Sequence, residues 1–449
     1  MTWENKIMRT VRCRNPQTRG TLAKLLMAIA DEGGTVGAIR LIKESHQAVV
    51  RDISVYADDD RQLGNILEAM EANPGTRILA VRDEILELHQ QGKIAIRSRY
   101  KIDNLYTLRR VYTPGVAEVC LKIAEEPSLA RSYTAISHLV AIVTDGTAIL
   151  GLGDIGPTAG MPVMEGKAML MESLVGLSGV PILLDTKDVD QIVDTVANIA
   201  PTFAAIQLED ISAPRCFEIE TQLQERLDIP VMHDDQHGTA VVTTAALTNA
   251  CRQSNIDIKK ATIGQTGLGA AGLATSQMLM SYTGNPVLGA DLSQEALARF
   301  EAAGGIKSGL EEIMQKADVV IATTGAPGLI KPEMVREGQI IFALSNPTPE
   351  IEPEIALEAG AAFAADGKSV NNVLGFPGIL RGAVDTQVPY ISHAMYLTAA
   401  RTIADLTKEG ELVPNPLNKD VHKAVARAVA EQAIKEGLAR SDFVSYVDD

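Results

Sequence analysis

Four acidic residues in two adjacent pairs are the part of this sequence best suited to bind a cation. Glu209-Asp210 follows one predicted strand, and Asp234-Asp235 follows the next. The segment between the pairs has the length of one crossover helix, so neighbouring parallel strands should bring both pairs to the same carboxyl edge of a sheet. Four like charges there would repel each other unless a cation lay between them. Oxygen ligands favour Mg²⁺ or Mn²⁺, and the alternative is two solvated acidic loops.

A lysine and a tyrosine are the candidate proton-transfer groups. A helix predicted to start near Pro162 would put Lys167 in its first turns, where the helix dipole disfavours a cation and burial would lower the lysine pKa further. Such a lysine can act as a base near neutral pH, although a surface lysine is the simpler interpretation of this stretch alone. Tyr112 precedes Thr113-Pro114, which predicts a helix with Thr113 as its N-cap. Its phenol could act as an acid or base there, or the ring could merely pack at the helix start.

A glycine-rich turn predicts a dinucleotide site in the second half of the chain. Residues 261–272 read ATIGQTGLGAAG, a short strand that leads through G-x-G-x-x-G into a helix. Such glycines permit a tight turn and the close approach of a pyrophosphate to the helix N-terminus, although a plain βα turn can also be glycine-rich. The residues predicted to contact the cofactor here are Gly267, Leu268, Gly269, Ala270 and Gly272.

Asp291 ends the next predicted strand, where such folds place a carboxylate that binds the adenosine ribose. It can accept hydrogen bonds from the free ribose hydroxyls of NAD, whereas the 2′-phosphate of NADP would meet a like charge. The nearest basic residues that follow are Arg299 and Lys307, either of which could fold back toward a phosphate. We therefore predict NAD in preference to NADP.

Two asparagines and two histidines are further candidate binding residues. Asn346 follows a predicted strand and Asn371 lies in another loop, so their amides could bind a substrate carboxylate or the nicotinamide ribose, or could be turn residues. His233 and His237 lie four apart, which superficially suggests a zinc pair on a helix. The segment reads as a strand-to-helix loop and lacks the glutamate of that motif, which favours structural roles for both histidines.

The first 83 residues are predicted to form a ferredoxin-like βαββαβ domain. This pattern, with the Asn-Pro…Arg-Gly turn at residues 15–20, resembles an ACT domain, a small-molecule regulatory module. The resemblance implies an effector site, and a domain that only dimerises is the alternative. The strands are expected at 7–13, 36–43, 49–56 and 78–81, and the helices at 21–31 and 61–70.

The rest of the chain is predicted to be α/β, with a substrate and metal domain followed by a Rossmann-type dinucleotide-binding domain. A helical connector is expected at 84–110, and a long helix at 239–251 should join the two domains. Asp145-Gly146 predicts a hairpin between strands at 139–144 and 148–152. The expected domains are 1–83, 84–238, 239–392 and a helical segment, 393–449, that packs back on the catalytic domain.

Composition narrows the classes of partner. The net charge of −16 argues against a nucleic-acid-binding face and against docking on anionic membranes. No apolar run approaches the length of a membrane span, and the first ten residues lack the apolar core of a secretory signal. Four scattered cysteines fit neither a disulfide framework nor a zinc site. We expect a cytoplasmic protein that forms a homodimer or a higher homo-oligomer and binds small molecules.

Several motifs follow one another between about residues 100 and 440. They are Tyr112-Thr-Pro-Gly-Val-Ala, Leu150-Gly-Leu-Gly-Asp-Ile-Gly, Glu165-Gly-Lys, Glu209-Asp, His233-Asp-Asp-Gln-His-Gly-Thr, Ser345-Asn-Pro-Thr and Asn371-Asn. Their order and number resemble the malic enzyme family in its short bacterial form. One departure concerns the larger eukaryotic relatives, which carry an arginine shortly before the Gly-Leu-Gly-Asp run, where this chain has Thr147-Ala148. How the substrate carboxylates are held therefore stays open.

The resemblance implies oxidative decarboxylation of L-malate to pyruvate and CO₂, with NAD and a divalent cation, Mg²⁺ or Mn²⁺. By motif position it implies that Tyr112 is the general acid and Lys167 the general base. It also implies three metal ligands, which are Glu209, Asp210 and Asp235. The residues implied to contact malate are Asn346 and Asn371, together with the acid and the base.

Three other functions stay open at this point. A malolactic-type enzyme would keep its cofactor bound and release lactate. An amino-acid dehydrogenase also pairs a catalytic lysine with a Rossmann domain, but it would not need two pairs of carboxylates. A non-catalytic metabolite sensor is a third function, and the complete set of tyrosine, lysine and acidic residues argues against it.

Overall fold

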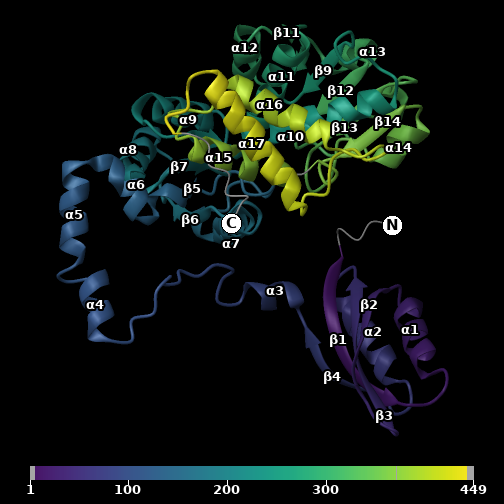
Figure 1. Cartoon of the computed structure of the whole chain (residues 1–449). Helices are drawn as coiled ribbons and strands as arrows, with labels where there is room; N and C mark the ends of the chain where they lie inside the picture. The colour runs from purple at the N-terminus through teal and green to yellow at the C-terminus, as the bar shows by residue number, and fades with distance from the viewer. Residues whose placement is uncertain (1–5, 371, 442–449) are drawn as a thin grey trace. The chain divides into compact units, whose positions relative to one another are not determined.

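The computed structural model describes residues 6–370 and 372–441 (Figure 1). The chain divides into two compact units, Met1–Ala95 and Ile96–Asp449. The first unit extends past the predicted boundary at residue 83 because it includes the short helix α3 (Glu84–His89), which contacts strand β1. The finer division of the second unit into three domains stays a prediction.

One antiparallel sheet and two helices form most of the first unit. The strand order is β2-β3-β1-β4, so that β1 lies between β3 and β4. The predicted ferredoxin-like element order is therefore confirmed. The bounds are β1 (Ile7–Pro16), α1 (Thr21–Asp31), β2 (Thr35–Glu44), β3 (Ala48–Ala57), α2 (Asp60–Glu71) and β4 (Arg77–Arg82).

The core of this unit lies between one face of the sheet and the two helices. Alternate residues of the central strands are buried there, such as Val11 and Cys13 of β1 and Ile53 of β3. This alternation follows from the two-residue period of a strand. The helices complete the cluster with Leu25, Ile29, Leu63, Ile66 and Met70.

A buried carboxylate organises the opposite face of the same sheet. Asp52 of β3 is 4% exposed, and its two oxygens accept hydrogen bonds from Arg12 of β1 at 2.7 and 2.9 Å. Arg82 of β4 donates to the same carboxylate at 3.0 Å and lies 3.7 Å from Glu84 of α3. The hydrogen bond from Arg12 lowers the pKa of Asp52 by more than burial raises it. One negative charge thus joins three strands.

The segment after the first unit buries little of its surface. Helices α4 (Leu105–Val111) and α5 (Val116–Glu125) contain no buried residue. The predicted helical connector at 84–110 is only partly right, because residues 90–104 are neither helix nor strand. Gln91 and Gly92 have φ angles of 65° and 79°, which end α3.

A four-stranded parallel sheet of order β6-β5-β7-β8 forms the first half of the second unit. Its helices follow the strands in the β-α alternation that the sequence predicted. The bounds are α6 (Ala130–Tyr133), β5 (Leu139–Thr144), α7 (Pro157–Val175), β6 (Ser178–Leu183), α8 (Val189–Ile199), β7 (Ala205–Leu208), α9 (Arg215–Arg226) and β8 (Val231–His233).

The hairpin predicted around Asp145-Gly146 is wrong. Strand β5 is parallel to both of its neighbours, β6 and β7, so neither edge is open to an antiparallel partner. Asp145 instead accepts hydrogen bonds from the backbone and hydroxyl of Thr147 and pairs with Arg215 at 2.7 Å. The Asp-Gly pair therefore begins the loop that leads to α7.

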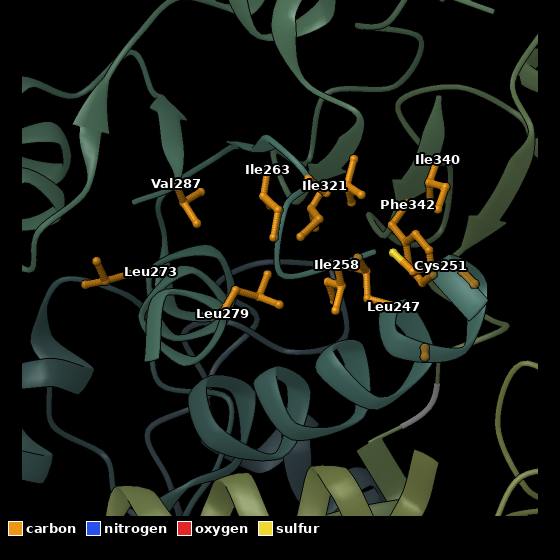
Figure 2. Close-up of a cluster of buried hydrophobic side chains, with 14 of the residues drawn as sticks. Leu247, Cys251, Ile258, Ile263, Leu273, Leu279, Val287, Ile321, Ile340 and Phe342 are labelled. Carbon is orange, nitrogen blue, oxygen red and sulfur yellow. The ribbon is translucent and has the colours of Figure 1, made fainter. Parts of the chain in front are cut away.

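A six-stranded parallel sheet of order β11-β10-β9-β12-β13-β14 confirms the Rossmann-type domain. Figure 2 shows the buried cluster on one of its faces, where Ile263, Ile321 and Phe342 of the strands meet Leu247 of helix α10. The bounds are β9 (Ile263–Thr266), α11 (Ala270–Thr283), β10 (Leu288–Ala290), α12 (Gln294–Ala302), β11 (Ile306–Lys307), α13 (Leu310–Lys316), β12 (Val319–Ala322), β13 (Ile340–Ala343), α14 (Pro353–Glu358) and β14 (Phe363–Asp366).

Helix α10 (Asp234–Gln253) joins the two parallel sheets and is buried along most of its length. It begins directly after β8, five residues before the predicted start at Thr239, and the acidic residues of its first turn suit the positive end of the helix dipole. Helix α16 packs on α10, and α17 packs on α15 and α7 (Figure 1). These three helices are α15 (Phe376–Asp385), α16 (His393–Asp405) and α17 (Lys419–Lys435).

No helix in the described part of the chain is long and apolar enough to cross a membrane. The four cysteines, Cys13, Cys120, Cys216 and Cys251, are all unpaired. The cytoplasmic location expected from the sequence stays a prediction.

Replacing Asp52 by Asn should loosen the first unit. The change removes the charge on which two arginines converge and should destabilise the unit by about 2–4 kcal/mol. Because folding lowers the pKa of Asp52, its contribution is fully present above the pKa of the unfolded chain and is lost as the pH falls through the lowered pKa of the folded chain. Hydrogen exchange of the β1 and β3 amides in the full chain measures the effect.

Asp58→Asn is the matched control for this experiment. Asp58 is mostly exposed and pairs with Lys6 at 3.3 Å, so its loss should change amide protection little. Equal protection in the Asp52→Asn variant and the parent chain would contradict the role given to Asp52.

Candidate active site

The two acidic pairs meet at the carboxyl edge of the first parallel sheet, as the sequence predicted. Glu209 and Asp210 follow β7, while Asp234 and Asp235 form the first turn of α10, directly after β8. Because β7 and β8 are parallel neighbours, both pairs lie at the same edge. One carboxylate oxygen from each of Glu209, Asp210 and Asp235 lies within 4.8 Å of the other two.

Burial and mutual repulsion make this acidic cluster electrostatically unfavourable by itself. Burial, with the charge of Asp235 adding to it, raises the pKa of Asp210 to about 7. Burial also raises the pKa values of Glu209 and Asp234. The backbone N–H of Asp210 donates to Asp235 at 2.9 Å, but the buried Oδ2 of Asp210 has no hydrogen-bond partner among the described residues. An oxygen-only cluster with an unpartnered buried oxygen fits a hard divalent cation.

Lys167 provides the positive charge within this cluster. Its ammonium lies 3.0 Å from Glu209 and donates a hydrogen bond to Asp234. The helix that carries it, α7, begins at Pro157 rather than near Pro162, so Lys167 lies near the helix middle and not in its first turns. Burial alone would lower the pKa of Lys167, but the two carboxylates outweigh burial and raise it. The predicted lowering of the Lys167 pKa is therefore wrong for the chain without a bound cation.

Asp234 and Asn372 belong to the site, but the sequence analysis gave neither of them a role of its own. Asn372 donates to Oδ2 of Asp234 at 2.7 Å, on the carboxylate that also holds Lys167. Gly238 lies one turn along α10, and a side chain there would clash with the other oxygen of Asp234. The sequence signals for these two residues were the adjacent acidic pair and the Asn-Asn pair. Asn371, the predicted substrate residue, lies outside the described residues.

Phe376 contacts Lys167 from a different element. The ammonium lies 4.6 Å from the centre of the ring, which is fully buried at the start of α15. The negative face of an aromatic ring attracts a cation at this distance. Lys167 is therefore held by carboxylates and by this ring.

A buried glutamate on α9 fixes the segment that carries Asp234 and Asp235. Glu220 accepts hydrogen bonds from the backbone N–H of His233 at 2.8 Å, from Gln236 at 3.0 Å and from His237 at 3.0 Å. Burial opposes ionisation of Glu220, but the charge of His237 outweighs it and lowers the Glu220 pKa. The segment is a helix start rather than the predicted loop. His237 has the structural role that was favoured.

Tyr112 is largely exposed and does not begin a helix. It is the C-cap of α4, and its N–H bonds to the carbonyl of Leu108 at 2.9 Å. The predicted N-cap at Thr113 is wrong, because Gly115 caps α5 and its N–H bonds to the carbonyl of Arg109 at 2.9 Å. The Tyr112 side chain is 66% exposed, on a helix that buries nothing.

The glycine-rich loop between β9 and α11 has the close contacts that its sequence predicted. Gly267 has a φ of +83°, and a side chain there would clash with the carbonyl of Thr323, at the end of neighbouring β12. A side chain on Gly272 would clash with the carbonyl of Gly267. Glycine is therefore required at both positions, and the loop lies where the strand order reverses, which is the ligand site of this sheet type. The remaining predicted contacts, Leu268, Gly269 and Ala270, lie in the same loop and at the start of α11.

Asp291 is tied to the glycine-rich loop. One oxygen accepts a hydrogen bond from the N–H of Leu268 at 2.6 Å, and the other accepts one from Ser293 at 2.8 Å. Neither basic residue that follows is bonded to it: Arg299 lies over the ring of Phe217, and Lys307 bonds to Gln294. The described residues thus offer no cation beside Asp291 to receive a 2′-phosphate.

Asn346 lies where loops from the two parallel sheets meet. It follows β13 of the second sheet, and its carbonyl approaches Gly151 in the loop after β5 so closely that a side chain on Gly151 would clash with it. The Asn346 side chain lies against Gly367. Asn346 therefore belongs to the dinucleotide-binding sheet and lies next to a loop of the first sheet.

Two family profiles match the chain. The profile described as "Malic enzyme, N-terminal domain" matches residues 91–189 and 186–224, and the profile described as "Malic enzyme, NAD binding domain" matches residues 293–435. The first match includes Tyr112, Lys167 and the acidic pair after β7.

Relatives match along most of the chain. The NAD-dependent malic enzyme 1 of Bacillus subtilis (strain 168) is 54% identical over 430 residues, which are 95% of this chain and 98% of that protein. The bifunctional malic/malolactic enzyme of the same organism is 43% identical over 81% of this chain and 95% of its own length. The crystal structure of malic enzyme from Pyrococcus horikoshii Ot3 has a TM-score of 0.75 at 41% identity, and covers 80% of this chain and 92% of that one. This chain therefore belongs to the malic enzyme family.

Proposed function

We propose that this protein oxidatively decarboxylates L-malate to pyruvate and CO₂ with NAD⁺ and a divalent cation. The observation that carries the proposal is the lysine buried among carboxylates at the edge of the first sheet. Its relatives support the proposal, since the Bacillus subtilis protein is named an NAD-dependent malic enzyme. The Rossmann-type sheet supplies a dinucleotide loop in the same unit.

Glu209, Asp210 and Asp235 are the proposed ligands of Mg²⁺ or Mn²⁺. Bound there, the cation would act as a Lewis acid toward substrate oxygens and would offset the carboxylates that raise the pKa of Lys167. The backbone contact between Asp210 and Asp235 holds two of these ligands together before any ion binds. Asp234 is directed to the lysine instead, which leaves it outside the ligand set.

Lys167 is the proposed general base. In this role it takes the proton from the C2 hydroxyl of malate, and NAD⁺ at the glycine-rich loop supplies the hydride acceptor for C2. Asp234 and Phe376 hold the amine in place, and Asn372 holds Asp234. Loss of CO₂ leaves the enolate of pyruvate, which then needs a proton at C3. Tyr112 is the proposed donor of that proton, and Asn346 and Asn371 are proposed to contact malate.

Tyr112 needs a second copy of the chain for this role. Its side chain is exposed, and helices α4 and α5 bury nothing within the described chain. We propose a homodimer in which this surface is covered and Tyr112 completes the partner's site. Such an exposed apolar group is typical of an interaction surface. Its large apolar residues are Leu105, Tyr106, Val111, Tyr112 and Leu121.

The first test is a spectrophotometric assay of NADH formation from L-malate with Mn²⁺. Excess EDTA should abolish the signal, because the carboxylates cannot replace the charge of the cation. Lys167→Ala should reduce the rate by about 10²–10⁴-fold, since a positioned base is lost. Lys187→Ala is the control, because that lysine is exposed and pairs with Asp154 on the surface. Full activity in EDTA would remove the metal from the proposal.

The same assay separates the alternative functions. One relative is named a bifunctional malic/malolactic enzyme, so lactate should be measured beside NADH. Lactate release without net NADH would identify the malolactic function. Reduction of NAD⁺ by an amino acid in the presence of EDTA would identify an amino-acid dehydrogenase, and turnover of neither substrate would favour a non-catalytic sensor.

A mixing experiment tests the shared site. Lys167→Ala and Tyr112→Phe should each be nearly inactive alone, but unfolding and refolding them together should restore activity, because one site in each mixed dimer has both groups intact. Each variant refolded alone is the control. A mixed dimer that stays inactive would mean that Tyr112 serves its own subunit, and a Tyr112→Phe variant that is active alone would mean that Tyr112 has no catalytic role.

The cofactor preference is expected to favour NAD⁺. A 2′-phosphate would meet the charge of Asp291, and no described cation stands beside it. Asp291→Ser should narrow the preference by removing this repulsion and by weakening NAD⁺ binding. The cofactor preference is measured from the kcat/KM for each cofactor at saturating malate and Mn²⁺. A value for NADP⁺ equal to that for NAD⁺ in the parent chain would contradict the assignment of Asp291.

The first unit is proposed to regulate the enzyme by binding a small effector, in keeping with its ACT-like pattern. Removal of residues 1–95 should then leave malate turnover intact and remove the response to added metabolites. A change in assembly size without a change in response would instead identify a dimerisation domain. Unaltered assembly and unaltered response would exclude both roles.

A further inference from the structure

A cavity of about 460 Å³ lies beside Glu220 and is lined by parts of both parallel-sheet domains. Its walls come from α9, the first turn of α10, α11, α12 and the start of α16. Its volume is that of a small-molecule site. None of the predicted active-site residues that the structure describes lines this cavity.

Arg299 is the charged group that the cavity leaves uncompensated. It makes no ion pair and no hydrogen bond with the described residues, and its buried Nε has no partner. Its guanidinium instead lies 5.4 Å from the centre of the Phe217 ring. Stacking of this kind leaves the N–H groups at the edge of the guanidinium available to an oxyanion. A partly buried arginine with no partner needs an explanation, because burial of an unpaired charge is unfavourable.

The other titratable groups around the cavity do not neutralise Arg299. Glu220 is paired with His237 at 3.0 Å and accepts two further hydrogen bonds. Glu218 lines an adjoining hollow with Arg299, but the two form no ion pair in the described part of the chain, and its carboxylate accepts a hydrogen bond from Gln222 at 3.1 Å. Burial lowers the pKa of His393 and raises that of Tyr396, which keeps both side chains uncharged near neutral pH.

The remaining walls suit a small polar molecule. Thr221, Gln224 and Gln277 offer hydroxyl and amide groups from α9 and α11. Tyr396 stacks on His237 with ring centres 4.6 Å apart, and its buried hydroxyl has no partner among the described residues. The cavity therefore combines one free cation, several neutral polar groups and a flat aromatic wall.

We propose that this cavity binds a small organic anion, whose phosphate or carboxylate group pairs with Arg299. An occupant that touches Thr221 or Gln224 as well as Arg299 would connect the substrate domain to the dinucleotide-binding domain. It would also lie against Gln236 and His237, which share Glu220 with the backbone of His233. The cavity is thus lined directly by the turn of α10 that carries the proposed metal ligand Asp235.

Isothermal titration calorimetry tests the binding directly. Glycerol 3-phosphate and glycerate are the probes, because they present the two oxyanions on similar three-carbon frames, and inorganic phosphate shows whether the oxyanion suffices. The titrations are made with saturating NADH, at constant ionic strength, so that the glycine-rich loop is occupied. Arg299→Gln should weaken binding by about tenfold or more, since a charge-assisted hydrogen bond is lost. Arg299→Lys, which keeps the charge but not the planar fork, should bind with intermediate affinity.

Arg401→Gln is the matched control. Arg401 also stacks on a ring, that of Tyr282 at 5.5 Å, but it does not line the cavity. This variant should bind the probes like the parent chain, and far-UV circular dichroism confirms that each variant is folded. Absence of binding by the parent chain to all three probes would overturn the proposal, as would equal affinities of the Arg299→Gln and Arg401→Gln variants. The titration needs no malate turnover, so its result is separate from that of the proposed function.

Discussion

The second unit is organised around negative charge that is buried at the carboxyl edge of its first sheet. Glu209, Asp210 and Asp234 are almost inaccessible to water, and Asp235 adds a fourth carboxylate. Removal of each charge from water is unfavourable by several kcal/mol, so the arrangement needs counter-charge. Lys167 supplies one positive charge and pairs with Asp234 and Glu209. The remaining imbalance is what a divalent cation would neutralise, which explains why proton-transfer and metal-binding groups share one site.

The surrounding structure determines where these charges lie. Helix α10 starts without a loop after β8, so its first two residues are carried directly to the sheet edge. Glu220 then fixes the same junction from the neighbouring helix α9, through the backbone of His233 and the side chain of Gln236. Gly238 leaves room for the carboxylate of Asp234. The positions of the acidic groups thus depend on contacts made by residues that take no part in the proposed chemistry.

The sequence predicted the acidic site well because its logic is topological: parallel strands that are neighbours must present their carboxyl ends together. The sequence also predicted the glycine-rich loop, because close contacts with the local backbone require glycine at positions 267 and 272. Local signals failed where two of them competed. Pro162 has the features of a helix start, but Pro157 begins α7; Thr113-Pro114 has those of a cap, but Gly115 caps α5.

Long-range information was also missing from the sequence. The Asp145-Gly146 pair has a hairpin signature, but both edges of β5 are occupied by strands that are distant along the chain. The pKa of Lys167 depends on carboxylates from β7 and α10, so its own helix could not predict its direction. Tyr112 shows this limit most clearly, because its side chain is exposed in a single chain and the helix before it contains no buried residue.

The close approach of Gly151 to Asn346 sets a limit on movement between the two sheets. The loop after β5 and the loop after β13 meet with backbone against backbone, at a position where any side chain would clash. The thickness of a peptide group is therefore the least separation that the two loops can reach at this point. If hydride passes between ligands held on the two sheets, this backbone contact limits how closely those ligands can approach. A single methyl group at residue 151 would push the two loops apart and would lengthen the hydride-transfer distance.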